Sequence, residues 1–180
     1  PFNLSEHCRN TFKIARHCAD LIGIEPLVRD RTPVGDEPEV LKSSDFKAAF
    51  GLAAKQVGEW SQMGNGGLRP SQVVVLAPDS QKENYPEQLG SVPMTTKYDD
   101  WADDKGVLLS SARRFHGLEA FAVVILWVPS DDLDHLMEQY FARSRAKYLL
   151  LVVEVDGTED SATALAAAEE PEDLPEPDSL

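Results

Sequence analysis

Two arginines lie where a predicted helix begins or ends, and an arginine placed there could bind phosphate. Arg9 lies at the start of a predicted helix, and Arg145 lies between a predicted helix and the strand that follows it. A guanidinium group is planar and can form two parallel hydrogen bonds to phosphate oxygens. Taken singly, Arg9 is more often a solvated or capping arginine, and Arg145 is more often a cation at the negative pole of a helix. Their phosphate chemistry therefore depends on the surrounding sequence.

Histidine, cysteine and aspartate residues occur in groups that could suggest a metal site. His7-Cys8 and His17-Cys18 are ten residues apart within one predicted helix, which separates the pairs by about 15 Å and places them too far apart for one zinc ion. Three aspartates between residues 131 and 134 lie at a predicted helix start, where the helix dipole accounts for acidic residues. We therefore expect no metal ligands in this chain.

Four apolar runs of strand length predict a sheet that is covered on both faces. They are residues 72–77, 107–109, 122–128 and 148–155, and a short strand is expected near Val40. Runs without polar alternation indicate strands that are buried on both faces. Because the strands alternate with helical patterns, the sequence predicts a three-layer, doubly wound α/β domain with a mainly parallel sheet.

Three amphipathic patterns predict the helices of this domain. The first ends before Gly23, and the second spans residues 45–63 with Ser44 or Asp45 as its N-cap. The third follows Ser130, and its end is basic, with Arg143, Arg145 and Lys147. Its apolar side chains repeat at helical spacing, namely Leu133, Leu136, Met137, Tyr140 and Phe141.

Three segments resemble, in the same order, motifs IV, V and VI of the second RecA-like domain of UvrD/Rep-like superfamily-one DNA helicases. Residues 4–11 are similar to motif IV, residues 110–119 to motif V and residues 139–147 to motif VI. Residues 68–77 also resemble the strand entry that lies between these motifs in the family. The resemblance covers the chain from residue 4 to about 155, and it implies a RecA-like domain of the P-loop NTPase type.

The resemblance implies that Arg9 and Arg145 are catalytic residues. Arg9 would reach the γ-phosphate of ATP held by the other motor domain, and Arg145 would act as an arginine finger on the same phosphate. Such a cation stabilises charge in the transition state of phosphoryl transfer when two domains close. Arg143 has no role assigned by the motif.

Residues 110–119 resemble the most specific of the three motifs. The resemblance implies that Glu119 contacts the nucleotide ribose, that Gly117 permits close approach of the backbone, and that Ser111 contacts a DNA phosphate. His116 stands where the family usually has lysine, so a nucleic-acid contact there would involve a side chain that is mostly neutral at pH 7. Phe115 and Leu118 of the same segment are expected in the core.

The sequence contains no Gly-x-x-x-x-Gly-Lys-Ser/Thr, so the resemblance implies half of a motor. It implies ATP with Mg²⁺ held mainly by a missing N-terminal motor domain, and it implies that domain and single-stranded DNA as partners. We expect no ATP hydrolysis by this chain alone. A degenerate helicase-like module that binds protein or nucleic acid without ATP turnover remains open, because His7 and His116 depart from the family pattern. An unrelated α/β binding domain or small enzyme would require three accidental matches.

Composition sets the expected boundaries. A chain of 180 residues that is 42% hydrophobic can form one domain with a core, but is too short for a complete two-domain motor. Nine of the 31 acidic residues and none of the 17 basic residues lie in 156–180, which predicts a disordered acidic tail after a domain spanning residues 1–155. The domain would then carry 22 acidic residues and a net charge of about −5.

Two cysteines and the absence of a long apolar run predict a cytoplasmic protein without a membrane span.

Overall fold

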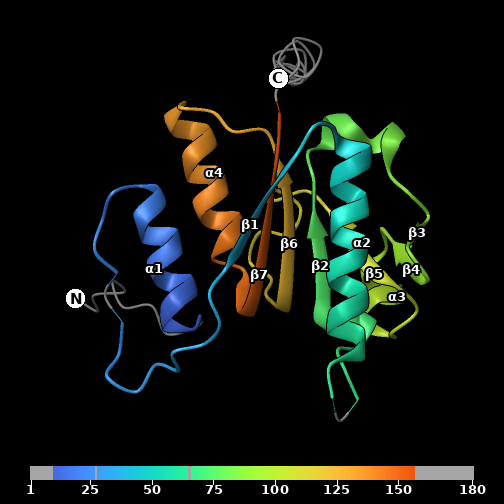
Figure 1. Ribbon diagram of the computed structural model, residues 1–180, viewed down its shortest axis with the longest axis horizontal. Helices are drawn as coiled ribbons and strands as arrows, with labels where there is room; N and C mark the ends of the chain where they lie inside the picture. Colours follow the sequence, from blue (N-terminus) through green and yellow to red (C-terminus); the bar gives the residue numbers. More distant parts are fainter. Residues whose placement is uncertain (1–9, 27, 65, 157–180) are drawn as a thin grey trace, which may run out of the picture.

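A seven-stranded, mainly parallel sheet forms the centre of the protein (Figure 1). The computed structural model describes residues 10–26, 28–64 and 66–156. The strand order is β1-β7-β6-β2-β5-β4-β3, and every neighbouring pair is parallel except β3 with β4. The strands are β1 (Glu39–Ser43), β2 (Val73–Leu76), β3 (Gln88–Leu89), β4 (Val92–Thr95), β5 (Val107–Ser110), β6 (Ala120–Trp127) and β7 (Ala146–Val155).

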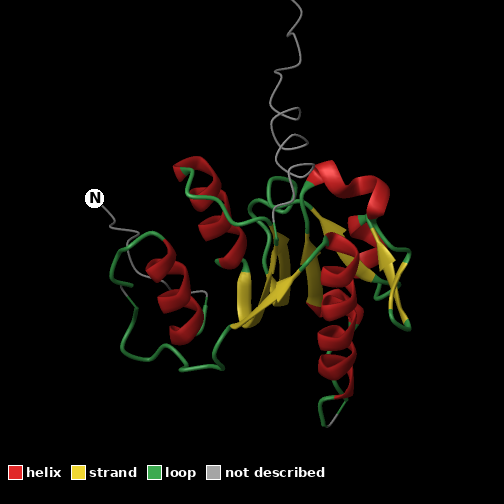
Figure 2. Cartoon of the chain, turned by 45° about the horizontal axis from the view of Figure 1, so that its top comes forward, coloured by secondary structure: helices red, strands yellow, loops and turns green. Residues whose placement is uncertain are grey.

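Helices cover the two faces of this sheet and complete the three layers. Helix α2 (Phe46–Gln62) packs on one face, whereas α1 (Phe12–Leu21) and α4 (Leu133–Arg143) pack together on the other. Figure 2 shows α1 and α4 on the side of the sheet opposite to α2. Three shorter elements are α3 (Tyr98–Ala102), η1 (Pro70–Gln72) and η2 (Asp79–Asn84). The predicted three-layer α/β fold is confirmed.

Strand β2 shows why the apolar runs lack polar alternation. Val73 and Val75 pack in the layer beneath α2, and Val74 and Leu76 pack in the layer beneath α1 and α4. All four residues are buried. A central parallel strand has two buried faces, so both sets of side chains must be apolar.

Helix α2 begins as the sequence predicts. Asp45 adopts an extended conformation, and its side chain accepts a hydrogen bond of 2.8 Å from the Ala48 backbone N–H. This satisfies one of the N–H groups that the first turn of a helix leaves without a partner.

The connection from β5 to β6 crosses the sheet without a helix. Strand β2 lies between β5 and β6, so residues 111–119 pass over it from the carboxyl edge of the sheet to the amino edge. Phe115 anchors this segment because its ring is fully buried in the layer that α1 and α4 also cover. It meets the Trp101 ring edge-on, with the centroids 5.9 Å apart. One short segment therefore links the two edges.

Two helix predictions need correction. Helix α1 begins at Phe12 after an extended Thr11, so the prediction of one helix containing both Cys8 and Cys18 is wrong, and Cys8 lies outside the described residues. In α4 the buried residues are Gln139, Ala142 and Arg143, whereas Phe141 from the predicted apolar face is 44% exposed. Arg143 stacks on Trp127 of β6 and thereby turns a different side of the helix toward the sheet.

Residues 78–106 contain elements that the sequence analysis did not predict. They form η2, the short antiparallel pair β3 and β4, and α3 at one edge of the sheet. Strand β3 has two residues and β4 contains Pro93, so neither produces an apolar run.

Of the predicted acidic tail, only Asp156 lies within the described residues. None of the helices in the described ranges has the length and apolar character needed to cross a bilayer.

Replacing Phe115 with alanine tests the anchoring of the crossover. We expect Phe115→Ala to lower the free energy of unfolding by roughly 3–5 kcal/mol, because a fully buried aromatic ring leaves a cavity. Phe141→Ala is the matched control and should cost less than about 1 kcal/mol, because that ring is partly exposed. Urea unfolding followed by circular dichroism measures both, and equal losses would contradict the anchoring role.

Candidate functional site

The amino edge of the sheet joins the ends of two segments that are far apart in sequence. The Asn10 amide donates hydrogen bonds to the carbonyls of Ser144 (2.8 Å) and Ala146 (2.5 Å), and the Thr11 N–H donates to the Lys147 carbonyl (3.1 Å). Asn10 and Thr11, at the end of the segment that resembles motif IV, are therefore joined to the backbone of the segment that resembles motif VI. Arg9 itself lies outside the described residues.

Glu119 and Arg145 occupy equivalent places at this edge. Glu119 precedes β6 and Arg145 precedes β7, and these strands are parallel neighbours. The N–H of Ala120 donates to the Arg145 carbonyl over 3.1 Å, which holds the two strand starts together. The Glu119 carboxylate forms an ion pair with Lys147, with 3.1 Å between Oε2 and Nζ. The Glu119 carboxylate and Arg145 thus lie at the same edge of the sheet. Both match positions that contact the nucleotide in the family that the sequence resembles.

The Arg145 side chain folds back on the end of α4. Its Nε donates to the Phe141 carbonyl (3.0 Å) and its Nη2 donates to the Ser144 hydroxyl (3.1 Å). In this position the guanidinium caps the negative pole of the helix. A phosphate ligand would therefore have to replace two neutral acceptors.

Arg143 differs from Arg145 in being almost completely buried. Only 4% of the residue is exposed, and its guanidinium carbon lies 5.0 Å from the centroid of the Trp127 ring. Its Nη1 lies 3.1 Å from Nε2 of His17. Because arginine can only donate, His17 accepts at Nε2 and is neutral there. Arg143, which the motif resemblance leaves without a role, therefore joins α1, α4 and β6.

Burial and the charge of Arg143 both lower the pKa of His17, burial being the larger cause. The nearby acids Asp20 and Glu37 act in the opposite direction with smaller effect. The neutral imidazole is therefore the form that the folded protein favours.

Gly117, His116 and Leu118 lie on the exposed part of the crossover. Gly117 has a φ of +83°, a conformation that residues with a side chain rarely adopt, and a Cβ there would meet nothing within 4 Å. The backbone conformation explains the glycine, and the space beside it is open. The His116 ring lies edge-on to Phe141, with centroids 6.5 Å apart. Leu118 is 40% exposed, so the expectation of a core leucine is wrong, whereas Phe115 is buried as expected.

Ser111 lies at the opposite, carboxyl edge. The residue is buried, and its hydroxyl forms no hydrogen bond of standard geometry with any described residue, although it lies close enough to Asp79 to stabilise that carboxylate. The structure therefore separates Ser111 from Glu119 and Arg145 by the height of the sheet.

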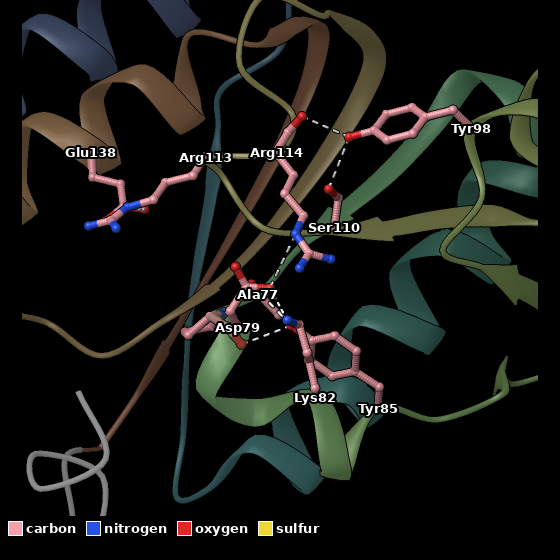
Figure 3. A network of polar contacts seen from close by, with 10 residues as sticks. Ala77, Asp79, Lys82, Tyr85, Tyr98, Ser110, Arg113, Arg114 and Glu138 are labelled. Carbon is pink, nitrogen blue, oxygen red and sulfur yellow. Dashed lines mark hydrogen bonds and ion pairs between the residues drawn. The ribbon is translucent and has the colours of Figure 1, made fainter. Parts of the chain in front are cut away.

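A polar network lies at the carboxyl edge of the sheet, around Asp79, Arg114 and Tyr98 (Figure 3). Asp79 follows β2 and lies 3.2 Å from Nζ of Lys82 and 3.8 Å from Nε of Arg114. Burial raises the pKa of Asp79, but Ser111 and these two cations outweigh it, so the pKa is lowered overall. Tyr98 donates to the Arg114 carbonyl over 2.8 Å. No sequence pattern predicted this cluster, although Arg114 lies inside the segment that resembles motif V.

Among the described residues, no group of three or more histidine, cysteine or acidic side chains could hold a metal ion. His7 and Cys8 lie outside those residues, so the structure does not test the prediction that this pair binds no zinc. The structure offers no described cluster to which a metal could be assigned.

Comparison with solved structures finds a similar fold in the C-terminal domain of a possible DNA helicase. A scan against protein-family models gives no match, and a search of curated proteins gives none either. The C-terminal domain of a possible DNA helicase from Lactobacillus plantarum superposes with a TM-score of 0.62 at 17% sequence identity. The superposition covers 84% of this chain and 89% of that one. The protein therefore has the fold of that helicase C-terminal domain.

Separate substitutions of the two arginines distinguish a structural residue from a surface one. We expect Arg143→Ala to lower the free energy of unfolding by roughly 2–4 kcal/mol, because it removes a buried side chain that packs on Trp127. Arg145→Ala should cost less than about 1 kcal/mol, because it removes only a helix-capping contact. Chemical denaturation measures both values, and a larger loss for Arg145→Ala would reverse the assignment.

The titration of His17 provides a second check. Its pKa should lie below 6.5 in the folded protein and should rise in Arg143→Met, because the neighbouring charge is removed. The lowered pKa contributes stability that is complete above the unfolded pKa and is lost as the pH falls through the folded value. Nuclear magnetic resonance of the imidazole protons measures the shift, and an elevated pKa would contradict the contact between Arg143 and neutral His17.

Proposed function

We propose that this chain is the second motor domain of an ATP-dependent DNA helicase or translocase of the UvrD/Rep-like kind. One observation carries the proposal. Segments that resemble motifs IV and VI and the end of motif V meet at one sheet edge. The Asn10 amide donates to the carbonyls of Ser144 and Ala146, and the Ala120 N–H donates to the carbonyl of Arg145. The similarity in fold to a possible DNA helicase supports it.

Glu119 and Arg145 have the chemistry that a nucleotide requires. The Glu119 carboxylate can accept a hydrogen bond from a ribose hydroxyl, and Arg145 can donate two hydrogen bonds to phosphate oxygens. Open space beside Gly117 allows a ligand to approach the backbone. Arg9 is proposed to reach the γ-phosphate, because it immediately precedes Asn10, which is fixed to the same edge. ATP with Mg²⁺, held mainly by the N-terminal motor domain, would supply the phosphoryl group.

Arg145 must change its partners to act as a finger. It now donates to a carbonyl and to a hydroxyl, both of which are neutral acceptors. A phosphate oxygen is a stronger acceptor, because hydrogen bonds between charged partners are about twice as strong as neutral ones. Approach of the nucleotide-bearing domain would therefore draw Arg145 away from the end of α4. Repeated closing and opening would move the protein along single-stranded DNA.

Exposed apolar side chains beside Arg145 and Glu119 support contact with a second domain. Leu118 is 40% exposed and Phe141 is 44% exposed. Leu118 adjoins Glu119, and the Phe141 carbonyl accepts from Arg145. Apolar side chains that gather around charged ligands are typical of a surface that another domain covers.

The proposed nucleic-acid contacts belong to different parts of the crossover. The buried Ser111 hydroxyl lies close to the Asp79 carboxylate, and we propose that it donates instead to a DNA phosphate that reaches the carboxyl edge. His116 lies against Phe141 near the other edge. A strand that contacts both residues would have to follow the crossover.

A module that binds without ATP turnover is the second candidate. The observation that favours it is the present position of Arg145, which is held by two acceptors of its own helix end. If those contacts persist when nucleotide binds, Arg145 remains a cap of its own helix and does not stabilise the charge of a phosphate.

ATP turnover by the complete parent protein tests the proposal. We expect single-stranded DNA to stimulate hydrolysis, and Arg145→Ala to reduce the stimulated rate by about 10³-fold or more, because a finger has an effect of this size. Arg16→Ala removes an equally charged, exposed side chain from α1 and should leave the rate unchanged.

Normal turnover in Arg145→Ala would exclude the finger role. A folded parent protein that has an intact P-loop and shows no turnover would favour the binding module.

A further inference from the structure

Asp79 pairs with two cations at the carboxyl edge of the sheet, where the proposed function places a DNA phosphate. Its Oδ1 lies 3.2 Å from Nζ of Lys82 and 3.8 Å from Nε of Arg114. We propose that Asp79 competes with nucleic-acid phosphate for these two cations and thereby lowers the affinity of this edge for a single strand. The inference rests on the proposed function, which assigns no role to Asp79, Lys82 or Arg114.

The two cations come from different segments and converge on one carboxylate oxygen. Lys82 lies in η2, three residues after Asp79, whereas Arg114 lies in the crossover between β5 and β6. Figure 3 shows both side chains directed at Asp79, while the neighbouring Arg113 points away toward Glu138. The side chains of Lys82 and Arg114 are 48% and 58% exposed, so a phosphate group can approach both cations from solvent.

Tyr85 fixes the backbone that leads into Asp79. Its hydroxyl lies 3.2 Å from the Ala77 carbonyl oxygen and 2.8 Å from that of Pro78, and it donates to this pair of acceptors. Burial, and to a smaller extent the charge of Asp79, raise the pKa of Tyr85 to about 12, so the phenol keeps its proton. The fold therefore places the carboxylate at this point independently of the two cations.

Tyr98 fixes the backbone of Arg114 in a similar way. Its hydroxyl donates to the Arg114 carbonyl over 2.8 Å and lies 3.3 Å from the Ser110 hydroxyl. These contacts join the crossover to α3 and to the end of β5. The guanidinium thus extends from a fixed point of the backbone, and a group that is already placed loses less freedom when it binds an anion.

Asp79 is ionised at neutral pH, so it competes with phosphate under all ordinary conditions. Burial alone would raise its pKa, but Ser111, Lys82 and Arg114 together lower it. Two cations and one carboxylate leave this cluster with a single net positive charge, and loss of the carboxylate charge would double it. Because the whole chain has a formal net charge of −14, local cations must supply the attraction for phosphate.

A phosphate that binds here must exchange with the carboxylate. The Ser111 hydroxyl is buried and stabilises the Asp79 carboxylate, so a phosphate can take this hydroxyl only after the carboxylate has moved. The attraction of the cations for phosphate is reduced by the ion pairs that have to be broken. The carboxylate can also pair with them again, which favours release of the strand, and differences of this kind appear mainly in the dissociation rate.

The variant Asp79→Asn of the 180-residue chain tests the proposal, with a fluorescently labelled oligothymidylate as the probe. Fluorescence anisotropy at low ionic strength measures the dissociation constant, and a salt series gives its salt dependence. We expect Asp79→Asn to bind about five-fold more tightly or better, because one repelling charge is lost and two cations are freed. The slope of log affinity against log salt should steepen by about 0.7, the contribution of one further phosphate contact on a single strand.

Two further variants separate competition from a general change in charge. Asp131→Asn removes an equal charge from the same edge, at an exposed position after β6, and should change the affinity by less than about two-fold. The double variant Asp79→Asn with Arg114→Gln should lose most of the gain, because one of the two freed cations is absent.

Urea unfolding distinguishes competition from a structural role of Asp79. We expect Asp79→Asn to be folded but less stable than the wild type, because it loses its ion pairs with Lys82 and Arg114. Binding and stability should therefore change in opposite directions. A merely structural residue would weaken both together.

Equal or weaker binding by folded Asp79→Asn would overturn the proposal, as would a gain of the same size in Asp131→Asn. Absence of binding by both the wild type and Asp79→Asn at low ionic strength would overturn it as well. These outcomes are distinguishable from failure of the proposed helicase function, which is measured by ATP turnover in the parent protein and by Arg145→Ala.

Discussion

The parallel pairing of β6 with β7 is the constraint on which the candidate site depends. The Ala120 N–H donates to the Arg145 carbonyl, and this contact sets the two strand starts side by side. Because parallel strands begin at the same edge of a sheet, the residues that precede them must meet, although they are far apart in sequence. Side chains of both strands contribute to the cores on both faces of the sheet, so the pair lies in the interior of the domain.

The crossover of residues 111–119 connects this edge to the opposite one. It carries Ser111 at the carboxyl edge, Glu119 at the amino edge and the buried Phe115 between them. In the proposed motor, this arrangement gives a direct physical path from nucleotide to nucleic acid. Gly117, with its positive φ, is the position at which the backbone turns toward β6.

The features that follow from continuous apolar runs could be predicted from the sequence, and those that depend on contacts could not. Strands β2, β5, β6 and β7 were predicted because their apolar runs indicate burial on both faces, and α2 was predicted because its apolar residues lie on one face of a helix. The buried face of α4 was not, because it depends on Arg143 stacking on Trp127, and an arginine at that position looks like a surface residue. Leu118 looks like a core residue but lies beside an exposed site. A hollow beside Lys147 is lined partly by a loop without periodicity, so no sequence pattern predicts it.

The central claim is that the amino edge of this sheet faces a nucleotide held by a second domain. Hydrogen–deuterium exchange of the complete parent protein, with and without a non-hydrolysable ATP analogue, tests it most directly. Our account predicts that the analogue slows exchange in residues 116–120 and 141–148, while α2 on the other face of the sheet is unchanged. Slowed exchange confined to α2, or no change at the amino edge despite saturation with the analogue, would contradict the account.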